Sequence, residues 1–349
     1  MSVPRFQLTS DYSISQVIKG GWHLAGGHGA ISANEAIADM LSFVQAGITT
    51  FDCADIYTGV EELIGQFLKH YRSQMASGEL PTVQVHTKYV PDYDALATLT
   101  KQDTERIIDR SLQRLGVERL DLVQFHWWDY QFPRYIDTAL HLKELQEAGK
   151  IRNIGITNFD TARVQEMVNA GVSIASNQVQ YSVFDQRAAN DEPEAYAPLG
   201  IPFLCYGVVA GGFLSPRWLG KTDPGEPYEN RSLTKYRLII EEFGSWGRYQ
   251  EVLQALQDIG QQYGVGSGEV ACRYVLQQQG IGGIIVGARN RDHLARLAGL
   301  VQFSLSPEDL ALIDALIAQG NGPQGPFYAL ERDKTGKHGA IMKYNLNKK

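Results

Sequence analysis

The sequence predicts a single (β/α)8 barrel, and three observations support this fold class. Eight short apolar runs are bounded by turn-forming residues, and eight is the number of strands in such a barrel. Several of these runs follow a helical pattern that stops at a glycine, and a repeated helix–glycine–strand order implies parallel strands. The chain has 349 residues with no linker or low-complexity block, which fits one barrel domain over residues 1–349.

The helices are predicted from capping residues that precede apolar residues at helical spacing. The first begins after the capping pair Ser32 and Glu35 and stops at Gly47. Three further helices, each followed by a glycine, are expected over residues 100–115, 135–148 and 160–170. The predicted strands are, in chain order, residues 16–21, 48–53, 83–89, 120–126, 152–156, 174–180, 202–207 and 282–286.

Two stretches depart from this alternation. Residues 215–246 are polar and rich in turn formers, and they predict a long loop before the eighth strand. Residues 320–349 form a C-terminal tail rich in glycine, proline and charge, for which disorder is one expectation. Aromatic residues in the tail could instead pin it to the barrel, namely Phe327, Tyr328 and Tyr344.

A doubly wound open sheet is the rival architecture. It would bind a dinucleotide through a G-x-G-x-x-G turn between an early strand and a helix. No such motif opens a helix in this chain. The barrel is therefore the favoured fold.

Composition limits the classes of partner. The net charge is −7, and lysines and arginines are scattered among acids rather than forming the basic stripe that a nucleic acid needs. The N-terminal residues lack the apolar core of a signal peptide, and no apolar run is long enough to span a bilayer. We therefore expect a cytoplasmic protein with neither nucleic acid nor membrane as a partner.

The three cysteines indicate neither disulfides nor structural zinc. Cys53, Cys205 and Cys272 are widely spaced, and no C-x-x-C motif is present. We expect them to be small buried side chains.

Ionisable residues close three consecutive strands of the predicted barrel. Asp52 ends the second strand, Lys88 lies at the end of the third and His126 closes the fourth, while Tyr57 follows shortly after Asp52. The carboxyl ends of barrel strands converge, so these side chains are expected to lie together. A barrel hydrolase with a metal is the alternative, but Asp52 and Asp55 lack a second histidine at metal spacing and a central lysine repels a cation. No metal site is predicted.

The stretch FDCADIYTGVEELIG, residues 51–65, resembles the signature of the aldo-keto reductase family. The spacing to Lys88 and then His126 is similar to that family's Asp, Tyr, Lys and His tetrad. The resemblance extends from about Gly20 to Leu300 and includes the segments GKIRNIGITNF, SNQVQYS and IIVGARN. It implies a carbonyl reductase that binds a nicotinamide cofactor.

Elementary chemistry supports the same catalytic roles. A phenol has a pKa of about 10, so Tyr57 holds its proton too tightly unless a cation is near. A cation about 4 Å away contributes about 4 kcal/mol at an effective dielectric constant of about 20, whereas two pKa units need only about 2.7 kcal/mol. We expect Lys88 to supply that cation and Asp52 to keep it charged. His126 is expected to orient the substrate oxygen by a hydrogen bond.

The resemblance also implies a cofactor site, with NADPH expected and NADH as the alternative. Thr157, Asn158 and Gln178 match residues that bind the nicotinamide carboxamide, and Tyr206 matches the ring that stacks on it. Further positions assigned to the cofactor are Gly21, Trp22, Asp52, the turn residues Gly207, Val208, Val209, Gly211 and Gly212, and the adenine-end residues Gly287, Arg289 and His293. At position 293 the family commonly has arginine or glutamine, so this end departs from the pattern.

The expected substrate is a small carbonyl compound, or an alcohol in the reverse direction. By analogy with the family, Trp22 and Trp127 would line the substrate site together with Tyr57 and His126, and aromatic walls favour apolar or aromatic aldehydes and ketones. A different class stays open, because some relatives are nicotinamide-binding regulatory subunits of ion channels with little turnover. The oligomeric state is not predicted.

Overall fold

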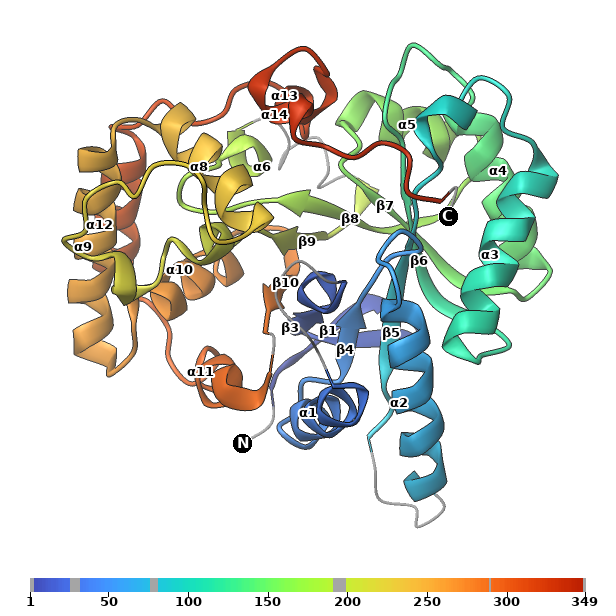
Figure 1. The fold of residues 1–349 in the computed structure, drawn as a ribbon, viewed down its shortest axis with the longest axis horizontal. Coiled ribbons are helices and arrows are strands. Elements are labelled where there is room, and N and C mark those ends of the chain that lie inside the picture. Colours follow the sequence, from blue (N-terminus) through green and yellow to red (C-terminus); the bar gives the residue numbers. More distant parts are fainter. Residues whose placement is uncertain (1–2, 26–31, 76–80, 191–198, 289, 348–349) are drawn as a thin grey trace. The chain divides into compact units, whose positions relative to one another are not determined.

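Eight parallel strands form a closed barrel in the computed structural model of this chain (Figure 1). The structure describes residues 3–25, 32–75, 81–190, 199–288 and 290–347. The order around the barrel is β10-β3-β4-β5-β6-β7-β8-β9, which confirms the predicted (β/α)8, or TIM, barrel. The strands are β3 (Val17–Gly20), β4 (Thr50–Asp52), β5 (Gln84–Tyr89), β6 (Leu120–His126), β7 (Ile151–Thr157), β8 (Ile174–Gln180), β9 (Phe203–Tyr206) and β10 (Ile281–Gly287).

Every predicted strand is observed, with boundaries that differ by at most two residues at either end. A two-stranded antiparallel sheet, β1 (Arg5–Thr9) and β2 (Tyr12–Ser15), precedes the barrel and was not predicted. Its strands of five and four residues are too short to give a clear alternation in the sequence.

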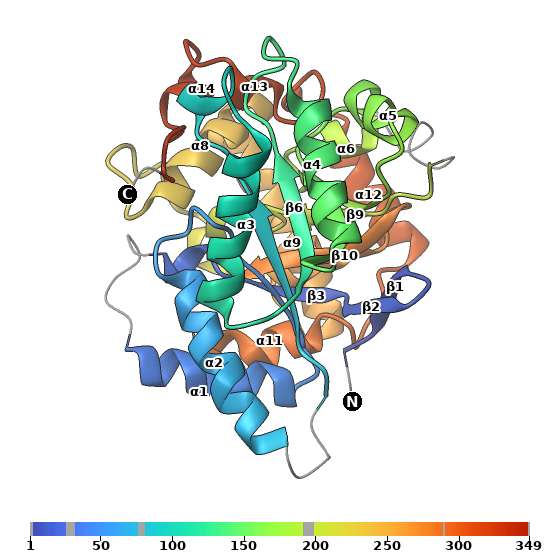
Figure 2. The same cartoon turned by 90° about the vertical axis from the view of Figure 1, so that its right-hand side faces the viewer.

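The four predicted helices are also observed, as α1 (Ala33–Gln45), α3 (Lys101–Leu115), α4 (Tyr135–Glu147) and α5 (Thr161–Asn169). Local chemistry explains their ends. Thr100 and Asp103 form a reciprocal capping box at the start of α3, and Gly116 ends that helix with a left-handed φ of 62°. A further helix, α2 (Val60–Met75), follows β4. Figure 2 shows α3 and α4 beside strand β6.

The chain separates into two compact units. The first comprises Met1–Gln178, Gly287–Leu294 and Lys343–Lys349, and the second comprises Val179–Val286 and Ala295–Met342. The prediction of a single domain over residues 1–349 stays a prediction. Helices of the second unit are α6 (Arg187–Asn190), α8 (Arg231–Phe243), α9 (Trp246–Tyr263), α10 (Ser267–Leu276), α12 (Pro307–Ile317), α13 (Ala329–Arg332) and α14 (Lys337–Ala340), while α11 (Leu294–Gly299) begins at the border.

The prediction of a long loop over residues 215–246 is wrong for its second half. A 3-10 turn (Pro216–Trp218) is followed by irregular chain and then by α8. Asn230 caps α8 by accepting a hydrogen bond from the Leu233 backbone N–H at 3.1 Å. The charged residues of this segment lie between apolar ones at helical spacing, and the buried face of α8 consists of Leu233, Tyr236, Ile239, Ile240 and Phe243.

The C-terminal tail is ordered over its described residues, so the expectation of disorder is wrong. It contains α13 and α14 in the second unit, and its last segment returns to the first unit. There the Tyr344 ring packs edge-on against Trp128 and Tyr93, with centroids 4.9 and 5.8 Å apart. Aromatic residues therefore do pin the tail.

Each unit has its own aromatic core. In the first unit Tyr89, Phe125 and Phe159 are fully buried, and in the second unit Phe184, Phe213 and Tyr249 are. Cys53, Cys205 and Cys272 are buried free thiols, as predicted.

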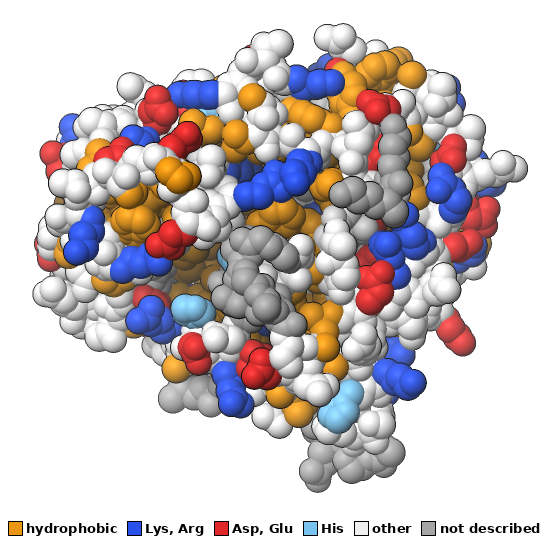
Figure 3. Space-filling view, in the orientation of Figure 1, with side chains coloured by type: hydrophobic (Ala, Val, Ile, Leu, Met, Phe, Trp, Pro, Cys, Tyr) orange, Lys and Arg blue, Asp and Glu red, His pale blue; other side chains and the backbone are white. Residues whose placement is uncertain are grey.

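Within the described part of the chain, the helices lack the length and apolar character needed to cross a membrane. On the face shown in Figure 3, lysine and arginine side chains are interspersed with acidic ones.

Candidate active site

A buried ion pair occupies the ends of β4 and β5. The parallel pairing of these strands aligns Asp52 with His86, two residues before Lys88. Lys88 Nζ donates to Asp52 Oδ2 at 2.6 Å and to the Cys53 carbonyl at 2.9 Å. Burial is the largest single influence and lowers the pKa of Lys88, but the charge of Asp52, its hydrogen bond and the nearby Tyr57 together outweigh burial, and the pKa rises to about 12. Lys88 is therefore a cation at neutral pH, as the sequence predicts.

Tyr57 lies beside this cation. A turn after β4, closed by the Tyr57 N–H and the Ala54 carbonyl at 3.0 Å, brings the residue next to the ion pair. The Lys88 Nζ is 5.2 Å from the centroid of the Tyr57 ring. Burial raises the pKa of Tyr57, whereas the charge of Lys88 and a hydrogen bond with it lower the pKa, and the net direction is upward. Lys88 therefore lowers the pKa of Tyr57, as expected, but burial raises that pKa by more.

Two glutamines complete the surroundings of Asp52. Gln124 Nε2 donates to Asp52 Oδ1 at 2.8 Å, and Gln178 Nε2 donates to the same oxygen at 2.7 Å and to Gln124 Oε1 at 2.7 Å. Because Oδ2 binds Lys88, both carboxylate oxygens of Asp52 are engaged. Sequence reasoning missed Gln124, although it lies two residues before His126 and so shares its face of β6.

His126 closes β6 and is held by the neighbouring strand. Its Nδ1 lies 3.2 Å from the Thr157 carbonyl, which pairs the two strand ends. A carbonyl oxygen only accepts, so Nδ1 carries the hydrogen in this contact. In a neutral ring the other nitrogen, Nε2, would then be an acceptor, and it can donate to a substrate oxygen only when the ring is protonated.

The expected role of Trp127 in the substrate site stays a prediction, and its contacts differ from those of Trp128. This side chain is fully buried, and its indole N–H donates to the Asp129 and Phe132 carbonyls at 2.9 and 3.0 Å. The neighbouring Trp128 is the one that packs edge-on against His126, with ring centroids 4.5 Å apart. Trp22 packs edge-on against Tyr57, with ring centroids 5.1 Å apart. Consecutive strand-end residues point to opposite sides, which separates the two tryptophans.

The expected carboxamide-binding residues lie together at the ends of β7 and β8. Thr157 pairs with Gln178, and the Asn158 N–H donates to the Gln178 carbonyl at 2.9 Å. Asn158 has a φ of 60°, a backbone conformation that is uncommon for a residue other than glycine and is concentrated at functional sites. The buried Thr157 Oγ1 has no hydrogen-bond partner among the described residues. An amide group of a cofactor would satisfy that oxygen, so these residues fit a nicotinamide.

Glycines at the edges of the site are tightly placed. The Gly21 N–H donates to the Asp52 carbonyl at 2.7 Å, and a Cβ at position 21 would lie only 2.7 Å from that oxygen. Gly287 lies against the His23 ring, where a Cβ would come within 2.0 Å of it. His293 is exposed in the 3-10 turn Arg291–His293, and Arg289 lies outside the described residues.

The second unit carries the turn expected to face a pyrophosphate. Tyr206 ends β9, and the chain then passes through Gly207, Val208 and Val209 into a 3-10 turn. Gly211 and Gly212 have φ values of 64° and 107°, and a Cβ on Gly212 would meet no atom within 4 Å. The backbone is therefore uncovered at Gly212, which fits the approach of a phosphate to backbone N–H groups.

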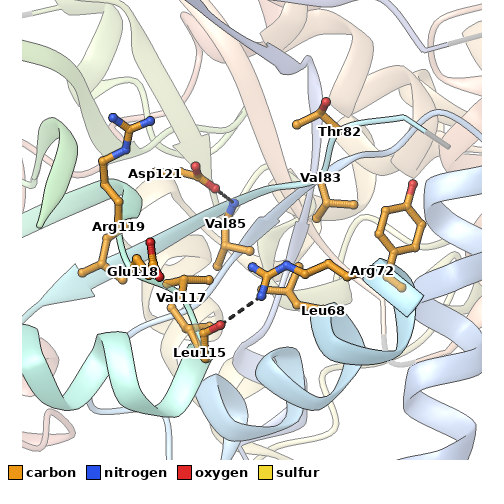
Figure 4. A pocket seen from close by; sticks show the side chains of 13 residues that line it. Leu68, Arg72, Thr82, Val83, Val85, Leu115, Val117, Glu118, Arg119 and Asp121 are labelled. Carbon is orange, nitrogen blue, oxygen red and sulfur yellow. Dashed lines mark hydrogen bonds between the residues drawn. The ribbon is translucent and has the colours of Figure 1, made fainter. Parts of the chain in front are cut away.

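A separate cavity of about 560 Å³ opens between α2 and the start of β6 in the first unit. Arg72, Val85 and Asp121 are among its lining residues (Figure 4). It lies at the amino-terminal ends of β5 and β6, whereas Lys88 and His126 lie at their carboxyl-terminal ends. None of the predicted catalytic residues lines it.

Comparisons with known proteins agree with the geometry. The family model described as Aldo/keto reductase family matches residues 16–318. The chain is 27% identical to the aldo-keto reductase YhdN of Bacillus subtilis (strain 168), over 90% of this chain and 93% of that protein. It is 24% identical to the NADH-specific methylglyoxal reductase of Escherichia coli (strain K12), over 87% of this chain and 95% of that protein.

A solved structure has the same fold. The glycerol dehydrogenase AKR11B4 from Gluconobacter oxydans superposes with a TM-score of 0.74 and 22% sequence identity, over 93% of this chain and 99% of that chain. The family match covers nearly the whole barrel. The chain therefore belongs to the aldo/keto reductase family, and it is an oxidoreductase that uses NAD(P)H.

Proposed function

We propose that the protein reduces aldehydes or ketones to alcohols with NADPH, and that Tyr57 is the general acid. The observation that carries the proposal is the buried Lys88, which binds Asp52 at 2.6 Å and lies 5.2 Å from the Tyr57 ring centroid. The reduced cofactor, when bound, supplies a hydride to the carbonyl carbon. The Tyr57 hydroxyl gives its proton to the carbonyl oxygen, so an alcohol forms.

The role of Lys88 is to make the Tyr57 proton easier to release. Burial raises the pKa of Tyr57, so the phenol is protonated at neutral pH but holds its proton tightly, and the charge of Lys88 opposes that effect. When the proton leaves, the Lys88 cation stabilises the phenolate that remains. A protonated His126 would add a hydrogen bond to the substrate oxygen as negative charge builds there.

The proposed substrates are carbonyl compounds with apolar or aromatic groups. Trp22 flanks Tyr57, and Trp128 flanks His126. Tyr344 from the tail extends the aromatic surface next to Trp128. Such side chains contribute large contact areas with substrate rings.

A Tyr57→Phe variant tests the catalytic assignment. The substitution removes the acidic hydroxyl and keeps the ring, so kcat should fall by about 10²–10⁴-fold while the Kd of NADPH stays within about two-fold of that of the wild type. The measurement is the loss of nicotinamide absorbance with a panel of aldehydes. Full turnover in the variant would refute the role of Tyr57, and absence of turnover in the wild type would favour a regulatory nicotinamide-binding subunit.

The choice of NADPH rests on Arg289, whose forked guanidinium suits the 2′-phosphate. A relative named as NADH-specific shows that either cofactor occurs among similar proteins. The Kd values of NADPH and NADH, measured on the same preparation, decide between them. Tighter binding of NADH would overturn the choice.

The cytoplasmic location of the protein stays a prediction.

A further inference from the structure

Lys235 is a half-buried lysine whose ammonium group lies over the ring proposed to stack on the nicotinamide. It lies in α8, and its side chain is only 17% exposed. Its Nζ is 5.1 Å from the centroid of the Tyr206 ring, 5.6 Å from that of Tyr236 and 5.5 Å from that of Tyr328. All four residues belong to the second unit.

A network of ionised groups surrounds this lysine. Its Nζ lies 3.9 Å from Glu331 Oε1, and Glu331 also binds the buried Arg187 at 3.0 Å. Arg187 in turn donates to Asp185 at 2.7 Å. Burial raises the pKa of Glu331, but Arg187 and Lys235 lower it further, to about 2, so this carboxylate is ionised at neutral pH.

The same carboxylate acts on the protonation of Lys235. Burial and the charge of Arg187 lower the pKa of Lys235, whereas the charges of Glu331 and Asp185 raise it, and the net direction is downward. The four formal charges of Lys235, Arg187, Glu331 and Asp185 cancel. Lys235 is the member whose Nζ lies over the Tyr206 ring, 5.1 Å from its centroid, and the negative charge of Glu331 lies 3.9 Å from that Nζ and offsets part of its field.

We propose that Lys235 makes the enzyme bind the reduced cofactor more tightly than the oxidised one. The inference rests on the proposed function, in which Tyr206 stacks on the nicotinamide. The oxidised nicotinamide ring is a cation and the reduced ring is neutral. A half-buried ammonium at this position therefore repels the oxidised ring and leaves the reduced ring unaffected, which favours release of the product cofactor during carbonyl reduction.

The size of the effect follows from the distance. Stacked aromatic rings have centroids about 4.5–7 Å apart, so a nicotinamide on Tyr206 would lie on the order of 10 Å from the lysine charge. Two unit charges at that separation change an affinity roughly ten-fold at an effective dielectric constant of about 20. Partial cancellation by Glu331 reduces this, and we expect roughly a three- to ten-fold difference.

The alternative is that Lys235 only holds Tyr206 in place through a cation–π contact. In that case its removal would weaken the binding of both cofactor forms to the same extent. The ratio of the two dissociation constants, Kd(oxidised)/Kd(reduced), therefore separates an electrostatic role from a structural one.

The test is fluorescence titration of the full-length protein with NADP⁺ and NADPH, without substrate. Lys235→Met keeps the length of the side chain and removes its charge. The ratio should be above one in the wild type and fall roughly three- to ten-fold in this variant. The matched control is Lys337→Met, which removes an exposed lysine of α14 that pairs with Glu241 and Glu242, and it should leave the ratio unchanged.

Glu331→Gln gives the opposite change in charge. It removes the negative partner of Lys235 and should raise the ratio. An unchanged ratio in a folded Lys235→Met variant overturns the inference. If either variant fails to fold, the wild type still decides, because equal affinity for the two cofactor forms also overturns it.

The same titration distinguishes failure of the inference from failure of the proposed function. If the wild type binds neither cofactor form, the proposed function fails. If it binds both and reduces aldehydes, but Lys235→Met leaves the ratio unchanged, only the inference about Lys235 fails.

Discussion

At the scale of single residues, Asp52 is the centre of the proposed catalytic cluster. One carboxylate oxygen holds the Lys88 cation, and the other accepts from Gln124 and Gln178. A carboxylate with both oxygens hydrogen-bonded has a fixed orientation, and the lysine it binds is fixed with it. We therefore expect Gln124 to be a positioning residue that acts on Tyr57 through Asp52 and Lys88.

A Gln124→Leu variant tests this role. It removes one hydrogen bond to Asp52 and leaves Gln178 without the acceptor Gln124 Oε1, at a cost to folding of about 1–3 kcal/mol. If positioning matters, kcat should fall roughly ten-fold or more, whereas the KM for the aldehyde should change little. Gln124→Glu, which restores an acceptor for Gln178, serves as the matched variant. A merely structural role would show as lower thermal stability with an unchanged kcat.

The placement of Asp52, Lys88 and His126 at the ends of neighbouring strands was predictable, because ionisable residues at the ends of apolar strands are a strong local signal. The contacts of Gln124 and Trp128 could not be predicted from the sequence. A glutamine inside a strand and the second of two adjacent tryptophans carry no distinctive pattern. Only the register of β6 determines which of these side chains points toward Asp52 or His126. With the same register, the Trp127 side chain is fully buried.

At the scale of elements, the C-terminal segment is part of the proposed substrate site. Its Tyr344 packs on Trp128 and Tyr93, and the Tyr344 carbonyl accepts from the Tyr93 N–H at 2.9 Å. Further along, Asn347 donates from Nδ2 to Asp55 Oδ2 at 3.0 Å and to the Val90 carbonyl at 2.7 Å. These contacts are specific hydrogen bonds as well as apolar packing.

We expect Tyr344→Ala to raise the KM for aromatic aldehydes roughly two- to ten-fold, because an aromatic pair contributes about 0.5–1.5 kcal/mol. The kcat for a small aliphatic aldehyde should stay unchanged, since the tetrad is intact. Steady-state kinetics with both substrates measures this difference. Lys343→Ala, which alters the exposed neighbour, is the control. Equal effects on both substrates would argue against a role of Tyr344 in substrate binding.

The helix α8 and the tail show why two elements escaped prediction. In α8 the apolar residues are interrupted by charged ones, so the segment resembles a loop until its spacing is followed from the Asn230 cap. The tail has few apolar residues, and its order depends on contacts with distant residues such as Asp55 and Trp128. Local sequence contains no record of such partners.

At the scale of the whole molecule, the barrel was predictable because its repeating unit is local. Helices α1, α3 and α5 each have a side-chain cap, and each apolar strand has its own run of residues, so several independent signals point to one topology. The short hairpin of β1 and β2 before β3 has no such set of repeated local signals, so it was not predicted. The division into two compact units also leaves no mark in the composition.

The stability of the molecule should depend on the buried Asp55. Burial and the charge of Glu61 raise its pKa from 3.8 to about 7, although Asn347, the Val90 N–H and Arg110 lower it. The folded state therefore holds a proton on Asp55 between about pH 4 and 7, where the unfolded state has lost it. The contribution of Asp55 to stability is complete below pH 4 and is lost as the pH rises to about 7.

An Asp55→Asn variant should remove this contribution to the pH dependence. The free energy of unfolding of the wild type should fall relative to that of the variant as the pH rises from 4 to 8, by at most about 4 kcal/mol. Urea denaturation at several pH values measures the difference. Parallel curves for the two proteins over this range would contradict the assignment.

The three buried thiols have a practical consequence. Burial raises the pKa of Cys53, Cys205 and Cys272, and thiolates are the species that react with maleimides. A cysteine introduced at an exposed position such as Lys343 would then be the reactive one in the native protein. A fluorophore attached there would report on the motion of the tail without replacement of any natural cysteine.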